Sequence, residues 1–104
     1  AYEILGFAAN GKGTQLLERG ATALPSAREN FAAGSPAFML PVNAGGGLIG
    51  DGHPVGATGV RQVVEAWLHL TNGAGARQIP GAKRFLTFNM GGSVTTSVVM
   101  IWGG

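Results

Sequence analysis

The clearest periodic pattern of apolar and polar residues lies between residues 55 and 71. Apolar side chains recur there at spacings of three and four residues, which places them along one side of a helix. This apolar face consists of Val60, Val63, Val64, Trp67, Leu68 and Thr71. Polar residues occupy the other side of the predicted helix. We therefore expect Trp67 in the core or in a subunit contact, and His69 in solvent.

Strand patterns lie on either side of this helix. Residues 84–90 and 93–102 are rich in β-branched and aromatic residues and are separated by two glycines, which predicts two strands joined by a tight turn. Both faces of each strand carry apolar groups, which favours an interior position over an exposed edge. Residues 37–43 predict a further buried strand, with Pro41 at a strand end, an edge or a bulge. The order strand, helix, strand, strand indicates an α/β layered arrangement.

The first third of the chain has weaker patterns. Residues 1–7 are expected to form the last turns of a helix, which could end at a glycine. Residues 10–37 predict a long excursion over the surface with one helical turn in "GTQLLERG".

The glycine-rich stretch 45–50 matches the dinucleotide-binding pattern G-x-G-x-x-G. In that fold a helix opens at the glycines, whereas here the predicted helix starts only after His53 and Pro54. No acidic residue ends a second strand about 20 residues later, as the pattern requires. The same two residues stand where a phosphate-binding loop needs Lys and Ser or Thr, so both nucleotide interpretations are rejected.

Composition narrows the classes of protein. The 104 residues suffice for one small domain, and only 12% of them are charged, which suggests that other protein covers much of the surface. The net charge of +2 comes from scattered basic residues, which argues against nucleic-acid binding. The absence of cysteine excludes disulfides and a thiol nucleophile within these residues. No apolar run reaches ~18 residues, so no membrane span is predicted.

His53 stands between a glycine and Pro54, directly before the predicted helix. Pro54 suits the first helical position, which puts His53 at or next to the N-cap, where Ser, Thr, Asp or Asn stabilise better. The free N–H groups and positive dipole of a helix start stabilise negative charge, so an imidazole there could serve an oxyanion or a nucleophile. The alternative is a histidine that only hydrogen-bonds a loop carbonyl. Two histidines without arranged carboxylates make no metal site.

Residues 41–59, "PVNAGGGLIGDGHPVGATG", resemble the C-terminal half of the thiolase superfamily. The family pattern is Asn-Pro-x-Gly-Gly followed by Gly-His-Pro-x-Gly-Ala-[Ser/Thr]-Gly, and Ala44 here replaces the proline. "YEILGF", "GKGTQLLERGAT" and "GARQIPGAK" are similar to thiolases of the sterol-carrier-protein type. "FNMGG" stands where that subfamily has His-Asn-x-Gly, so that Phe88 replaces a histidine and Asn89 matches.

The resemblance implies a thiolase-like αβαβα layered fold with two similar halves, of which residues 1–104 would be most of the C-terminal half. The N-terminal half would carry the nucleophilic cysteine, and a second, acid/base cysteine would precede "YEILGF". By motif match His53 would activate the nucleophile and help bind the thioester oxygen. Asn89 either donates an amide hydrogen bond into the pocket or satisfies backbone at the glycine turn. Asn43 either contacts the pocket or bonds backbone in the glycine loop.

The activity implied is that of a thiolase or acetyl-CoA acetyltransferase, which cleaves a 3-ketoacyl-CoA or runs the reverse Claisen condensation through an acyl-cysteine. These residues alone are expected to be inactive. A carbon–carbon lyase of the steroid side-chain aldolase kind and a non-catalytic assembly subunit are the alternatives.

The resemblance also implies partners and a location. Acyl-CoA is expected as substrate, with no tightly bound cofactor and no metal. The expected protein partners are the N-terminal half of the same protein, further copies in a homo-oligomer, and a small oligonucleotide-fold protein that gathers acyl-CoA. The expected location is cytoplasmic, or peroxisomal in a eukaryote.

Overall fold

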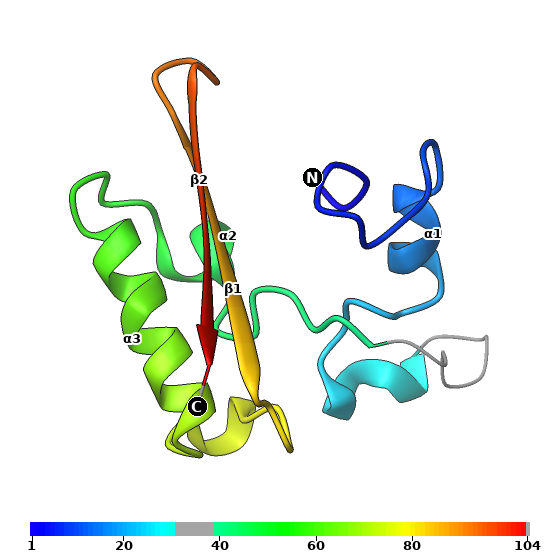
Figure 1. The fold of residues 1–104 in the computed structure, drawn as a ribbon. Helices are drawn as coiled ribbons and strands as arrows, with labels where there is room; N and C mark the ends of the chain where they lie inside the picture. Colours follow the sequence, from blue (N-terminus) through cyan, green and yellow to red (C-terminus); the bar gives the residue numbers. More distant parts are fainter. Residues whose placement is uncertain (31–38, 104) are drawn as a thin grey trace. The chain divides into compact units, whose positions relative to one another are not determined.

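The computed structural model describes residues 1–30 and 39–103, and the chain divides into two units (Figure 1). The first unit comprises Ala1–Ala44 and the second Gly45–Gly104. The second unit contains the histidine motif, the periodic helix and both C-terminal strands, so the residues of interest lie mainly in this unit.

The first unit contains the helix α1 (Gly13–Glu18) and the 3-10 helix η1 (Pro25–Asn30). The Glu3 carboxylate accepts a hydrogen bond of 2.9 Å from the amide of Gly13 at the start of α1. Hydrogen bonds from the backbone amides of Gly11 and Gly13 lower the pKa of the Glu3 carboxyl. This contact ties the N-terminal turns to α1. The helix α1 itself confirms the helical turn predicted in "GTQLLERG".

The predicted helical end at residues 1–7 is wrong. These residues form a series of turns, closed by hydrogen bonds such as that from the Leu5 amide to the Ala1 carbonyl at 2.9 Å. Gly6 has φ +78°, a left-handed conformation that stops a helical ladder from continuing through it.

The strand predicted at 37–43 is also wrong over residues 39–43, while residues 37 and 38 lie outside the described part. The amides of Leu40 and Val42 donate to backbone carbonyls at positions 21 and 22, at 2.9 and 3.0 Å. Pro41 between them has no N–H to donate, so two isolated bonds form in place of a ladder.

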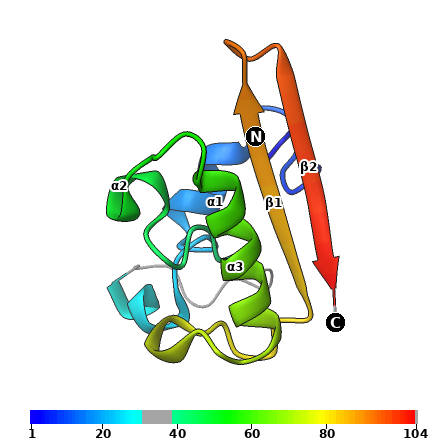
Figure 2. The same cartoon turned by 90° about the vertical axis from the view of Figure 1, so that its left-hand side faces the viewer.

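The second unit contains three helices and a hairpin. In chain order these are α2 (Gly47–Asp51), α3 (Thr58–Leu70), the 3-10 helix η2 (Gly75–Arg77), β1 (Arg84–Gly91) and β2 (Thr96–Gly103). β1 and β2 pair antiparallel, with Arg84 opposite Gly103 and Gly91 opposite Thr96. Helix α3 runs along one face of this hairpin (Figure 2).

The contact between α3 and β1 forms the interior of the second unit. Side chains alternate between the faces of a strand, so Phe85 and Asn89 lie on the same face of β1. The His69 ring stacks on Phe85 with the centroids 5.7 Å apart, and the Asn89 amide donates to the Gln62 side chain at 2.6 Å. Ala66 lies between these contacts in sequence and is 1% exposed, and its small side chain lets the helix approach the sheet closely.

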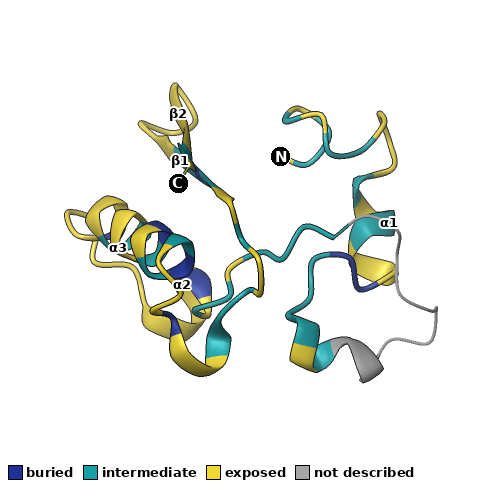
Figure 3. Ribbon diagram, turned by 60° about the horizontal axis from the view of Figure 1, so that its bottom comes forward, coloured by how far each residue is buried: buried dark blue, intermediate teal, exposed yellow. Residues whose placement is uncertain are grey.

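The face of α3 that packs within this chain is the opposite of the predicted one. Val60 is 66% and Trp67 62% exposed, whereas Thr58, Ala66 and His69 are buried (Figure 3). The expectation that His69 is solvated is therefore wrong. The reason is that β1 presents an aromatic ring and an amide toward α3, groups that suit a helix side carrying His, Gln and Ala.

The hairpin confirms the two predicted strands and corrects their position. β2 begins at Thr96 because the chain turns through residues 92–95, with Ser93 and Val94 at φ +56° and +73°. The interior position expected for the strands is not found among residues 1–30 and 39–103, where each strand is an edge of a two-stranded sheet. Apolar side chains of β2 remain exposed, including Ile101 at 70%.

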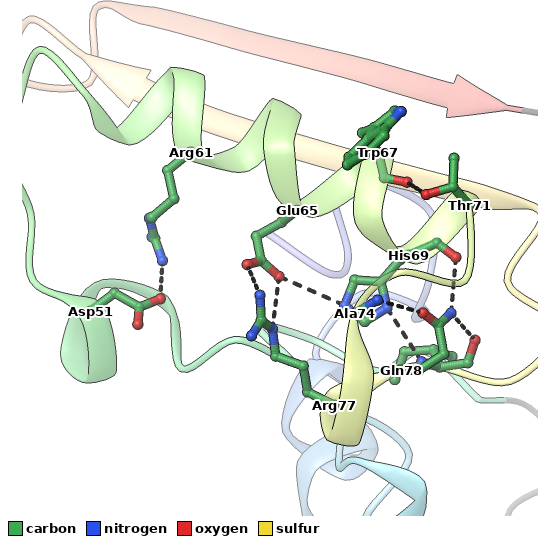
Figure 4. Close-up of polar contacts among 10 residues, drawn as sticks. Asp51, Arg61, Glu65, Trp67, His69, Thr71, Ala74, Arg77 and Gln78 are labelled. Carbon is green, nitrogen blue, oxygen red and sulfur yellow. Dashed lines mark hydrogen bonds and ion pairs between the residues drawn. The ribbon is translucent and has the colours of Figure 1, made fainter.

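His69 is held in a polar network at the C-terminal end of α3 (Figure 4). The Ile79 amide donates to Nδ1 of His69 at 3.3 Å, and Nε2 lies 3.7 Å from the carboxylate of Glu65, which also binds Arg77 at 2.7 Å. Burial lowers the pKa of the His69 imidazole, Glu65 opposes the shift and Arg77 adds to it.

The lowered pKa predicts how stability depends on pH. Just below about pH 6.5, the ordinary pKa of histidine, the unfolded chain binds a proton at His69 that the folded chain resists. The free energy of unfolding should therefore fall as the pH drops through this window, and His69 should contribute no slope above it. Protonation would also end the acceptor role of Nδ1 toward Ile79.

The measurement is chemical denaturation at a series of pH values, for the protein and for H69Q, which has no titratable group at position 69. The slope between pH 5 and about 6.5 should be shallower in H69Q. Equal slopes in the two proteins would contradict the assignment.

Candidate functional site

The segment before α3 folds back on itself. Helix α3 begins at Thr58 and its N-cap is Ala57, so His53 precedes the cap by four residues and the predicted N-cap position is wrong. The amides of Ala57 and Thr58 both donate to the Pro54 carbonyl, at 2.8 and 3.0 Å. These bonds close a turn over residues 54–58, and the regular helix α3 follows it.

The imidazole of His53 lies against the first residue of α3. Its Nδ1 is 2.7 Å from Oγ1 of Thr58, and the same hydroxyl donates to the Pro54 carbonyl at 3.2 Å. Thr58 is 5% exposed, whereas His53 is exposed. One edge of the ring is thus fixed by a buried hydroxyl and the rest faces outward, which keeps the ring available for an external group.

The glycine-rich stretch forms the short helix α2, which was not predicted. Its cap Gly46 has φ +102°, and a Cβ there would lie 3.1 Å from the backbone of Gly50, so only glycine fits. The argument that no helix opens in the G-x-G-x-x-G pattern is therefore wrong. The nucleotide interpretation still fails, because no strand among residues 39–46 leads into these glycines.

A second contact holds the segment that carries His53. Asp51 at the end of α2 forms an ion pair with Arg61 on α3, so the stretch between these residues is fastened to α3 at both ends (Figure 4). Both side chains are partly exposed, so the pair orients the segment more than it stabilises the fold.

Asn89 is positioned from the sheet. Its side-chain bond goes to Gln62 on α3 and not to backbone of the turn at residues 91–92, where Thr95 donates to the Gly92 carbonyl. Neighbouring residues of a strand point to opposite faces, so Phe88 lies on the side of β1 away from α3. Phe88 and Asn89 therefore do not act from the same face.

Helix α3 brings the two predicted site residues into one arrangement. His53 is bonded to Thr58 and Asn89 to Gln62, and these helical partners are four residues apart. Positions i and i+4 lie on the same side of a helix with Cβ atoms roughly 5–6 Å apart. The two candidate residues are thus anchored on consecutive turns of one side of α3.

Sequence reasoning missed both partners on α3. Thr58 is the Ser/Thr position of the Gly-His-Pro motif, five residues after the histidine, and this spacing was the available signal. Gln62 was placed on the polar side of the helix without a role. Asn43 has φ +52°, a left-handed conformation that asparagine tolerates, and the choice between a pocket contact and a backbone bond for its side chain stays a prediction.

Metal and membrane sites receive no support from residues 1–30 and 39–103. No group of three or more His, Cys, Asp or Glu side chains in this part of the chain is arranged to hold a metal ion. No helix within it is both long and apolar enough to cross a membrane.

The family follows from a comparison with known protein families. The model of the thiolase C-terminal domain-like family matches residues 1–104. This chain belongs to that family. The thiolase resemblance inferred from the Gly-His-Pro and glycine motifs is thereby confirmed, and an α/β fold fits both the family and the helices and strands described above.

Several relatives of this thiolase C-terminal domain are similar along most of its length. "Sterol carrier protein 2" of Bos taurus is 44% identical over 90 residues, which are 86% of this chain and 14% of the relative. "Acetyl-CoA acetyltransferase" of Methanothermobacter thermautotrophicus is 38% identical over 102 residues, 98% of this chain and 24% of the relative. "Non-specific lipid-transfer protein-like 2" of Caenorhabditis elegans is 36% identical over 86% of this chain and 19% of the relative. The chain thus spans less than a quarter of the length of these relatives.

The bond between Asn89 and Gln62 predicts a measurable coupling within the thiolase domain. In a double-mutant cycle of N89A and Q62A, the free energies of unfolding should be non-additive by about 1 kcal/mol, the net value of one hydrogen bond. N89A paired with T71V should be additive, because the Thr71 hydroxyl bonds the Trp67 carbonyl and has no part in this contact. Additivity in the Asn89–Gln62 cycle would show that the contact is not formed.

Proposed function

We propose that this chain is the C-terminal part of a coenzyme A-thioester acyltransferase that cleaves 3-ketoacyl-CoA or catalyses the reverse Claisen condensation. The observation that carries the proposal is the exposed imidazole of His53, fixed at one edge by Thr58 in the family's Gly-His-Pro motif. Family membership and the relative named "Acetyl-CoA acetyltransferase" support it.

The proposed chemistry needs a thiol that these residues do not contain. In the condensation direction, a cysteine in the N-terminal half would transfer its proton to the free nitrogen of His53, keep the S–H electron pair and attack the thioester carbonyl of an acyl-CoA, from which coenzyme A leaves and takes up a proton. In thiolysis the cysteine would attack the C3 ketone carbonyl of 3-ketoacyl-CoA, so that the C2–C3 bond breaks, its electron pair passes to the enolate of the released acyl-CoA, and that carbon is then protonated. The protonated imidazole would then donate to the oxygen on which negative charge develops. Asn89, anchored by Gln62 with one amide hydrogen left over, would supply a second donor.

Two uncovered apolar surfaces support a larger layered fold. One is the outer side of α3, with Val60 and Trp67, and the other is the face of the hairpin away from α3. That second surface combines Leu86 and Phe88 of β1 with Val99 and Ile101 of β2. A helix layer and a sheet layer that are each uncovered on their outer side are expected of the inner layers of an αβαβα fold. We propose that the N-terminal half of the same protein covers the α3 surface.

Trp67 tests this arrangement. In the complete protein, W67A should lower the free energy of unfolding by about 3–5 kcal/mol, the usual loss for a buried tryptophan. At its present exposure of 62%, the same change should cost far less. The measurement is chemical denaturation, and a loss below about 1 kcal/mol would mean that nothing packs on this face of α3.

The role of His53 is tested by turnover. In the complete enzyme, H53A should lower kcat for acetoacetyl-CoA thiolysis by about 10²–10³-fold, because it removes both the base and one oxyanion donor. H69Q is the matched control, since the second histidine of this chain is buried between α3 and β1, and its replacement should leave kcat nearly unchanged. Turnover of H53A within a few-fold of the parent enzyme would refute the proposal.

Phe88 favours a second candidate function. Phe88 stands where the sterol-carrier-protein-type thiolases have a histidine, so an apolar phenyl ring replaces a polar imidazole there. This departure from the thiolase pattern is the reason to keep a carbon–carbon lyase of the steroid side-chain aldolase type as the alternative. Release of an aldehyde or ketone from a 3-hydroxyacyl-CoA, without consumption of free coenzyme A, would distinguish this lyase from a thiolase. A complete protein with neither activity would favour the non-catalytic assembly subunit.

The partners belong to the same proposal. Acyl-CoA is the proposed substrate, in a homo-oligomer that associates with a small oligonucleotide-fold protein. The proposed location is the cytoplasm, or the peroxisome in a eukaryote.

A further inference from the structure

The hydroxyl of Thr58 lies between two groups that differ in what they can donate. Oγ1 is 2.7 Å from Nδ1 of His53 and 3.2 Å from the carbonyl oxygen of Pro54. The carbonyl can only accept a hydrogen bond, whereas a ring nitrogen of neutral histidine either donates or accepts. A hydroxyl has a single hydrogen, so the direction of the O–H bond decides which tautomer of neutral His53 the site stabilises.

The two directions are not equivalent in a buried position. If the hydroxyl hydrogen points at Nδ1, the lone pairs of Oγ1 face the lone pairs of the Pro54 oxygen at 3.2 Å, which is repulsive. If the hydrogen points at Pro54, both contacts are attractive, because Nδ1–H of His53 then donates to Oγ1. Thr58 is 5% exposed, so water cannot readily replace either bond and the second arrangement is favoured.

We propose that Thr58 is a positioning residue that holds the proton of neutral His53 on Nδ1 and leaves Nε2 as the free base. The chain of donors runs from His53 Nδ1–H to Thr58 Oγ1–H and ends on the Pro54 carbonyl. Uncoordinated histidine side chains in water favour the proton on Nε2, so Thr58 works against the intrinsic preference of the ring.

The consequence for chemistry rests on the proposed function. With Nδ1 occupied, the thiol proton goes to Nε2, and the S–H electron pair stays on sulfur. The resulting imidazolium keeps its Nδ1–H bond to Thr58, so the ring does not turn while Nε2–H donates to the thioester oxygen. One fixed orientation then serves both proton transfer and charge stabilisation.

The direct test is the tautomer of His53 in the complete protein. Solid-state 15N NMR of protein labelled at its histidine imidazoles, at a pH where His53 is neutral, shows which ring nitrogen lacks a proton. The His53 signals are assigned by their loss in H53Q. We expect Nε2 to be the unprotonated nitrogen, and an unprotonated Nδ1 in the parent protein would overturn the proposal without any variant of Thr58.

Variants of Thr58 then test the cause. T58V has nearly the same shape without the hydroxyl and should move the proton toward Nε2 and lower kcat about tenfold, as expected for one lost hydrogen bond. T58S keeps a hydroxyl and should retain the tautomer and kcat within about twofold. T71V is the matched control, because Thr71 makes the same hydroxyl-to-carbonyl bond four residues back, to Trp67 at 2.8 Å, with no imidazole beside it.

These outcomes separate this proposal from the proposed function. A tautomer that is the same in T58V and the parent, or that also changes in T71V, would overturn the role of Thr58. H53A reports on the proposed function independently of the tautomer. If H53A loses thiolysis but Nδ1 of the parent protein is unprotonated, the acyltransferase proposal stands and the role of Thr58 is refuted. If the expected tautomer is found but H53A remains active, the acyltransferase proposal is refuted and the role of Thr58 in setting the tautomer stands.

Discussion

The second unit depends on the packing of one side of α3 against one face of β1. Ala66 permits a close approach, the His69 ring stacks on Phe85, and Gln62 accepts the hydrogen bond of Asn89. The contact is mostly polar and aromatic, which specifies the rotation of the helix, because a helix turned about its axis would leave these groups unpaired. The rotation sets where Thr58 lies, and Thr58 in turn holds His53.

The same rotation accounts for the uncovered apolar side of α3, which is one of two such surfaces. With its polar side on β1, α3 has its valines and Trp67 on the outside, while the hairpin presents its own apolar face on the opposite side. The low charge content of the chain agrees with this arrangement, since a surface that lies against other protein needs few charges. The uncovered apolar surfaces and the low charge content thus both support the larger layered fold proposed above.

Much of the fold was predictable from local patterns, and the errors have a common cause. The helix at Thr58–Leu70 and the two strands of the hairpin follow from periodicity and residue type, and the Gly-His-Pro motif correctly indicated the family. The face on which α3 packs could not be deduced, because periodicity identifies an apolar side without saying whether the same chain covers it. His69 was misplaced for this reason.

The candidate site was predictable as residues and not as contacts. His53 and Asn89 came from the motif, but their partners Thr58 and Gln62 depend on the turn at Pro54 and on the register of α3 against β1. The helix starts four residues later than predicted because residues 54–58 form a separate turn before it, a detail that the residue pattern did not specify. Motifs identify chemical groups, and the backbone path decides what those groups touch.

The exposed strand β2 has a consequence for how the chain behaves when separated from its surroundings. Thr96–Gly103 contains no proline and no charged side chain, and its outer backbone edge has no neighbouring strand among the described residues. An unguarded edge of this kind templates pairing with identical copies and can seed fibrous aggregates. In the larger fold proposed above, a segment that covers β2 would therefore also protect the chain against self-association.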